Sequence, residues 1–235
     1  MSSNGGRDPF ILRTTVPLRW IVAFSFLLLT VHEAHELAHA VVGRVVCDEW
    51  PIRDFNMWRF MGQCSSYLPT SAGPLFSYLL MAIGAAMALR RNGPSRWAGM
   101  ALLFAANPFA RIFTAVMGGG DEMVVAQHLA NLPERTATLR IVVIAFVLAV
   151  CGSAIVAGWR AMHGLKRRGA WFAFVLLWPM VLTGVALFVV GNRLLRAGVL
   201  AEPVIAGAPL LVVLVSAASA VAALMTWRWL SYEAV

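Results

Sequence analysis

Long apolar segments constrain the fold of this chain more than any other feature of its sequence. A helix needs roughly 20 residues, at about 1.5 Å each, to cross about 30 Å of hydrocarbon. Six segments are apolar enough and close enough to this length to do so, with short connections between them. The sequence therefore predicts an all-α integral membrane protein with about six transmembrane helices. The expected spans are Pro17–Val46, Gly73–Leu89, Trp97–Met117, Ile141–Trp159, Ala170–Gly191 and Gly207–Trp229.

Composition supports the membrane class. Of the 235 residues, 60% are hydrophobic and only 13% are charged, whereas a soluble domain carries about 25% charged residues. No internal repeat or low-complexity tract divides the chain, so we expect a single membrane domain over residues 1–235. The first twenty residues are polar and basic, but no small-residue cleavage site follows the first apolar run. We therefore expect a retained first span rather than a cleaved signal peptide.

The basic residues indicate orientation in the bilayer rather than a nucleic-acid partner. The formal charge of +8 comes from residues that cluster at span ends, such as Lys166, Arg167 and Arg168, where they meet anionic head groups. More of them fall on the N-terminal side of the membrane than on the other side, which favours a cytoplasmic N-terminus. We expect a multi-pass protein in the plasma membrane of a prokaryote, with the lipid bilayer as a partner and no nucleic acid.

The cysteines constrain the chain less. Cys47 and Cys64 bracket one loop, and either a disulfide or a free pair is consistent with the sequence. Cys151 lies in the middle of a predicted span, where we expect it to pack against its neighbours.

A polar cluster interrupts the first apolar segment. Residues 31–40 read V-H-E-A-H-E-L-A-H-A, and His35 to His39 within them form an H-E-x-x-H motif. On a helix, His35 and His39 project from one face, so both can reach a single Zn²⁺ at about 2.0–2.1 Å. Glu36 would then act as general base toward water at the metal. Because ionisable residues are costly inside a membrane, at about 2.5–3.5 kcal/mol for an acidic or basic side chain, we predict a zinc site with one ion per chain.

The other residues of the cluster have supporting roles in this interpretation. A register that began at His32 would place Glu36 where the second histidine should be, so only the His35 register fits the motif. His32 and Glu33 lie about one turn before the proposed metal. We expect them to assist the ligands by hydrogen bonding, or to line a path for water, rather than to bind the ion.

A catalytic zinc site needs a third protein ligand and an open position for water. The chain has only eleven acidic residues, and the best placed are Asp121 and Glu122, directly after three glycines at positions 118–120. Glycines permit a sharp turn that directs a carboxylate back toward the bundle. We expect Asp121 to be the ligand, with Glu122 as its rival. Asp121 would also suit the N-cap of a short helix at residues 122–131, and His128 is expected at the surface or near the ligands.

These motifs resemble the site-2 protease family of intramembrane zinc metalloproteases. In that family an H-E-x-x-H helix is followed by a β-like loop, here residues 45–67, and by a helix that opens with Ala-Gly-Pro, here Ala72 to Pro74. An aspartate ligand follows at the third helix. The resemblance covers about residues 18–130 and implies a three-helix catalytic core at residues 17–130, with three additional transmembrane helices at residues 141–230.

The resemblance also implies a role for Asn107, which precedes Pro108 and is expected to hydrogen-bond the substrate backbone. The chain departs from the family pattern because it lacks Leu-Asp-Gly and because Asp121 lies fourteen residues beyond Asn107. In the family the motif helix runs toward the cytosol, which is opposite to the direction that the basic residues favour here.

The predicted function is hydrolysis of a peptide bond in or near a transmembrane segment of a membrane protein. An intact helix hides its carbonyls in hydrogen bonds, so the substrate would be an unwound segment. The loop at residues 45–67 is suited to pair with such a segment by strand addition.

Other functions remain open at this point. Glu36 and His39 form an E-x-x-H, as in a membrane di-iron oxidase or hydroxylase, although no other glutamate has a histidine three residues on. A non-enzymatic metal-binding or transport protein would use the polar face as a pathway, although the last three spans carry almost no polar residues at mid-depth. A zinc membrane protease with glutamate as third ligand is a further alternative.

Overall fold

The computed structural model describes residues 16–62, 64–90 and 95–231. The basic segment before the first span, at residues 1–15, lies outside the described residues. Six helical segments of the described chain are long and apolar enough to cross a membrane, which confirms the six predicted spans and fits a multi-pass membrane protein. Their bounds are Leu18–Cys47, Leu68–Ala88, Ser95–Val116, Ala137–Ala161, Arg168–Arg196 and Leu210–Leu230.

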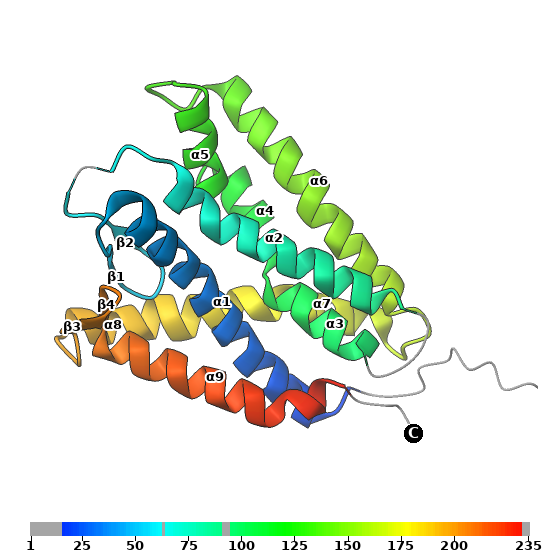
Figure 1. Cartoon of the computed structure of the whole chain (residues 1–235). Coiled ribbons are helices and arrows are strands. Elements are labelled where there is room, and N and C mark those ends of the chain that lie inside the picture. The colour runs from blue at the N-terminus through cyan, green and yellow to red at the C-terminus, as the bar shows by residue number, and fades with distance from the viewer. Residues whose placement is uncertain (1–15, 63, 91–94, 232–235) are drawn as a thin grey trace, which may run out of the picture.

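Helices make up most of the described chain, with two small antiparallel hairpins between them (Figure 1). The α-helices are α1 Leu18–Cys47, α2 Leu68–Ala88, α3 Ser95–Ala105, α4 Pro108–Val116, α5 Asp121–Leu129, α6 Ala137–Ala161, α7 Arg168–Leu182, α8 Asn192–Arg196 and α9 Leu210–Leu230. The π-helix η1, Thr183–Gly191, connects α7 to α8. The strands are β1 Ile52–Arg53, β2 Trp58–Arg59, β3 Pro203–Ile205 and β4 Ala208–Pro209.

Helix α1 is central to the bundle and packs against α2, α3 and α9. Its buried side chains recur every three or four residues, as expected for one inward face of a helix. The first half of this face is apolar, with Trp20, Phe24 and Leu28 packed into the main core. The second half carries Glu36 and His39, which are also buried. The same periodicity that packs the N-terminal half of α1 therefore directs the polar cluster into the protein.

The second and third helices differ from the prediction. The second helix begins at Leu68 rather than Gly73, with Pro69 in its first turn and Pro74 inside it. Proline is tolerated in a first turn because the amide hydrogen that it lacks has no partner there. The third span is not one helix from Trp97 to Met117, because Asn107 takes a left-handed conformation, with φ 54° and ψ 53°, between α3 and α4. A residue that precedes proline is disfavoured in the α-helical region, which explains a break at this position.

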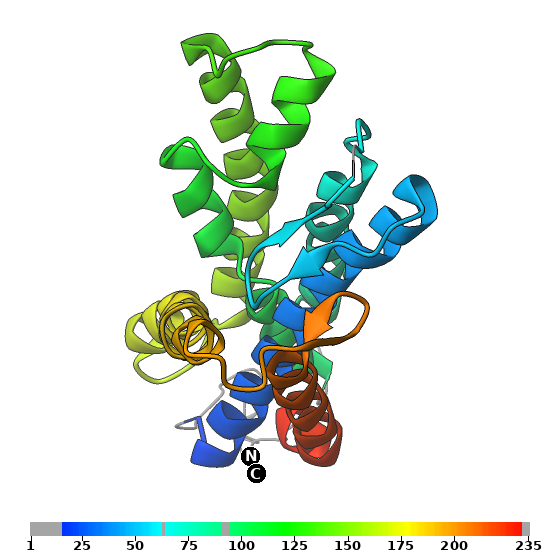
Figure 2. The ribbon, with the colours of Figure 1, turned by 90° about the vertical axis from the view of Figure 1, so that its left-hand side faces the viewer.

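The last two spans also differ from the prediction. The fifth continues to Arg196 through η1 and α8, and the sixth begins at Leu210 because residues 203–209 form the β3–β4 hairpin. The β-like loop after α1 is confirmed as the β1–β2 hairpin. Figure 2 shows the two hairpins on the same side of the molecule, where the amide of Arg53 donates to the carbonyl of Gly207 over 3.2 Å.

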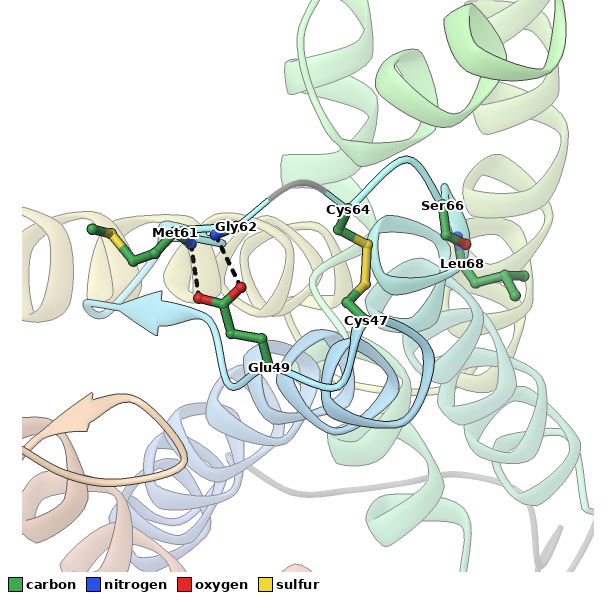
Figure 3. The surroundings of a disulfide bond; sticks show 7 residues. All are labelled: Cys47, Glu49, Met61, Gly62, Cys64, Ser66 and Leu68. Atoms are coloured by element: carbon green, nitrogen blue, oxygen red, sulfur yellow. Dashed lines mark hydrogen bonds between the residues drawn. A yellow bond between two sulfur atoms is a disulfide. The ribbon is translucent and has the colours of Figure 1, made fainter.

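A disulfide between Cys47 and Cys64 closes the loop that joins α1 to α2, with Cα atoms 5.6 Å apart (Figure 3). Within this loop the carboxylate of Glu49 accepts hydrogen bonds from the amides of Met61 and Gly62, both at 3.0 Å (Figure 3). The disulfide resolves the two alternatives in the sequence in favour of pairing. Cys151 is free and buried, in agreement with a packing role.

Candidate metal centre

The two histidines of the motif meet on the inward face of α1. Their Nε2 atoms are 3.2 Å apart, and both rings lie against Gly73 of α2. A Cβ atom at Gly73 would lie 2.3 Å from Nε2 of His39 and 2.6 Å from Cε1 of His35. Glycine at position 73 therefore provides the space that the two imidazoles occupy.

Asp121 reaches the same point from the beginning of α5. Gly118 and Gly120 have φ of 77° and 86°, in the left-handed region that glycine adopts without strain. They turn the chain after α4, so Oδ2 of Asp121 lies 3.4 Å from Nε2 of His35 and 3.5 Å from Nε2 of His39. Gly120 is the N-cap of α5, so the alternative interpretation of Asp121 as the N-cap was wrong.

These three atoms fit the geometry of a bound zinc ion. Their separations of 3.2, 3.4 and 3.5 Å match the edge of about 3.3–3.4 Å that a tetrahedron with bonds of about 2.0–2.1 Å requires. Among the described residues, His35, His39 and Asp121 are the group whose possible metal-binding atoms all lie within 4.8 Å of one another. Two nitrogens and one carboxylate oxygen leave one of four tetrahedral positions free, as in catalytic zinc sites.

Hydrogen bonds orient both imidazoles for metal binding. Nδ1 of His39 lies 2.7 Å from the carbonyl of Pro69, and Nδ1 of His35 lies 3.0 Å from Oγ of Ser77. Nδ1 of His39 can only donate to the carbonyl of Pro69, and this bond directs its Nε2 toward Asp121. Burial alone would raise the pKa of Asp121, but its hydrogen bonds with His35 and His39 lower it below its ordinary value. The carboxylate is therefore held in the charged form that binds cations.

Glu122 has different partners from its neighbour. It is buried, and its Oε1 accepts hydrogen bonds from the hydroxyl of Tyr78 and from Nη1 of Arg111, both at 2.6 Å. These bonds fix the first turn of α5 to α2 and α4. The structure therefore separates the two candidates: Asp121 lies with the histidines, and Glu122 anchors the turn that carries Asp121.

Sequence reasoning missed Arg111. Its Nη2 lies 2.9 Å from Nδ1 of His35 and donates to Oγ of Ser77 over 3.2 Å. Its ion pair with Glu122 balances a cation that would be costly inside a membrane. A single arginine inside the apolar third span was a signal that could have identified it.

A cavity of about 380 Å³ opens beside the candidate ligands. His35, Asp121 and the buried Glu36 line it, and so does Asn107. In the part of the chain that the structure describes, Oδ1 of Asn107 is buried and has no hydrogen-bond partner. Sequence reasoning also missed one wall of the cavity, from α7 and η1, because its residues are mostly apolar. They are Met180, Thr183, Gly184 and Phe188.

His32 and Glu33 connect the β1–β2 hairpin to α1. Nε2 of His32 lies 2.8 Å from the carbonyl of Phe55, and Oε1 of Glu33 accepts a hydrogen bond from Nη2 of Arg53 over 2.5 Å. His32 also lines the cavity. Both side chains therefore bind the loop rather than the ligand histidines. His128 is exposed and contacts Tyr67, with ring centroids 5.4 Å apart.

Comparison of the chain with models of known protein families, with curated proteins and with solved structures finds no match. The site must therefore be interpreted from its own geometry.

The close contact at Gly73 leads to a testable expectation. Gly73→Ala should weaken zinc binding at least about tenfold, because the added methyl group displaces both imidazoles. Zinc titration of the purified protein measures the change. Gly152→Ala is the matched control, since a Cβ there meets nothing within 4 Å. Equal zinc affinity in both variants would show that the ion is not held between these rings.

Proposed function

We propose that this protein is an intramembrane zinc metalloprotease, a divergent member of the site-2 protease family, that hydrolyses a peptide bond in or near a transmembrane segment. One observation carries the proposal: a tetrahedral donor set of His35, His39 and Asp121 adjoins a cavity that Glu36 also lines. Three convergent ligands leave a fourth coordination position of the metal free for water, and the carboxylate of Glu36 lines the same cavity. This arrangement suits hydrolysis.

Each residue of the site has a distinct role in the proposed hydrolysis. A zinc ion held there would act as a Lewis acid on the scissile carbonyl and would lower the pKa of water toward neutrality. Glu36 takes a proton from the attacking water and passes it to the leaving amine as the C–N bond breaks. Ser77 and the carbonyl of Pro69 keep the two imidazoles in the orientation that binds cations.

The substrate chemistry follows from the walls of the cavity. Oδ1 of Asn107 is an unused acceptor where α3 breaks, and it suits an amide hydrogen of a substrate backbone. A substrate helix exposes such amides only where it is unwound. The β1–β2 hairpin, which His32 of the cavity wall contacts at Phe55, offers the outer edge of β2 to an extended segment. These features favour a membrane protein or peptide as the substrate.

We further propose that α1 runs outward, with the N-terminus in the cytoplasm of a prokaryotic cell. The Cys47–Cys64 disulfide begins at the last residue of α1. Disulfides persist in oxidising compartments, which lie outside the plasma membrane. The distribution of basic residues among the connections favours the same orientation.

A reconstituted cleavage assay tests the proposal. Purified protein is placed in liposomes with a panel of single-span proteins whose helices carry central glycine and proline residues, and fragments are identified by mass spectrometry. We expect cleavage within or beside the span, its loss after chelation and its return with zinc. Iron with a visible absorption band and no cleavage would instead favour an oxidase, and metal flux into liposomes without cleavage would favour a transport protein.

A further inference from the structure

The C-terminal ends of α2 and α6 lie near the beginning of α3, at the opposite end of α2 from the metal centre (Figure 1). Residues from these three helix ends line a second pocket. Its volume is about 190 Å³. Of the described residues that line it, some are apolar, and all of the ionisable ones are basic. The apolar lining comes from Ala88, Leu89 and Ala161, and the basic lining comes from Arg90, Arg96, Arg160 and His163.

Among the described residues, no acidic side chain lines this pocket. The sequence has no aspartate or glutamate from residue 55 to 120 or from residue 135 to 201, so α2, α3, α6 and α7 contain none. Among the ion pairs of the described residues, none involves Arg90, Arg96 or Arg160. Three guanidinium groups around one small hollow repel one another, and an anion between them would remove that repulsion.

The three arginines are not equivalent. Nη2 of Arg96 donates to the carbonyl of Ala161, a contact that stabilises the end of α6. Nε of Arg96 is buried and has no partner in the described chain. Arg90 and Arg160 are exposed, and the described residues give their side chains no hydrogen-bond partner. The contact with the end of α6 therefore gives one nitrogen of Arg96 a partner. Within the described chain, Arg90 and Arg160 have no such contact.

We propose that this pocket binds a phosphate group, supplied by the headgroup of an anionic phospholipid or by free phosphate. Guanidinium groups bind phosphate oxygens through paired hydrogen bonds. The pocket lies where spans begin and end, which is the level of lipid head groups, and basic pockets between helices suit anionic head groups. The apolar lining offers a surface for the adjoining part of a lipid.

Lipid binding provides the first arm of the test. The protein is reconstituted in nanodiscs with phosphatidylglycerol or with phosphatidylcholine, and retained lipid is measured by native mass spectrometry after extraction. We expect retention of phosphatidylglycerol and at least about tenfold weaker retention in an Arg90→Gln, Arg160→Gln double variant. The control is Arg59→Gln with Arg193→Gln, which removes the same charge from exposed positions at the other end of the molecule.

Inorganic phosphate provides the second arm. Thermal unfolding in detergent is followed during a phosphate titration, with chloride at equal ionic strength as reference. If phosphate raises the melting temperature of the wild type but not of the Arg90, Arg160 variant, the pocket binds phosphate and free phosphate is a sufficient ligand. If the protein retains phosphatidylglycerol but phosphate has no such effect, the ligand is a lipid headgroup. The proposal is overturned if neither ligand binds, or if the control variant loses as much binding as the pocket variant.

Discussion

Replacement of Glu36 by glutamine is expected to lower cleavage on the order of 10²–10⁴-fold, the usual contribution of a general acid–base group. The amide of glutamine keeps nearly the same shape but cannot take the proton from water. Zinc content should stay at the wild-type level, because Glu36 is not one of the three residues whose donor atoms converge. Cleavage rates in liposomes and metal analysis of the same preparation measure both quantities.

Glu134→Gln is the control for this experiment, since Glu134 is exposed in the loop between α5 and α6. It should cleave at the wild-type rate. Full cleavage by the Glu36→Gln protein would exclude the proposed mechanism even if zinc is bound. Loss of zinc together with activity would show instead that Glu36 supports the metal.

The sequence was most informative where local spacing translates directly into geometry. Six apolar segments predicted six spans because the bilayer thickness sets a helix length. His35 and His39 were predicted to meet because residues four apart share a helix face. The three glycines predicted a turn before Asp121, and two of them have the positive φ that such a turn uses.

Features that depend on contacts between distant segments were harder to predict. Arg111 gains its importance from His35 and Glu122, which lie on other helices. Thr183 and Gly184 line the cavity although nothing in the fifth span distinguishes them from packing residues. The break at Asn107 did have a local signal, the following proline, but a continuous apolar segment outweighed it. The structure follows the proline, because Asn107 leaves the helical conformation directly before Pro108.

Asp121→Asn and Glu122→Gln are expected to affect zinc very differently although the residues are adjacent. Asparagine removes the charge from an atom that lies within 3.5 Å of both imidazoles. Zinc affinity should fall by more than about 100-fold, the upper end for loss of a residue that only orients a ligand. Zinc titration with a competing chelator measures affinities over this range.

Glu122→Gln should reduce zinc affinity less, by about 10–100-fold at most, because the carbonyl oxygen of the new side chain can still accept from Tyr78 and hold the turn. It removes the charge that balances the buried Arg111, so the free energy of unfolding should fall by about 1–3 kcal/mol. The two substitutions thus separate a ligand from an anchoring residue: Asp121→Asn loses the metal from a stable protein, whereas Glu122→Gln loses stability and a smaller part of its zinc affinity. Zinc loss confined to Glu122→Gln would make Glu122 the ligand, and α5 would then have to rotate from the position in which Arg111 and Tyr78 now hold it.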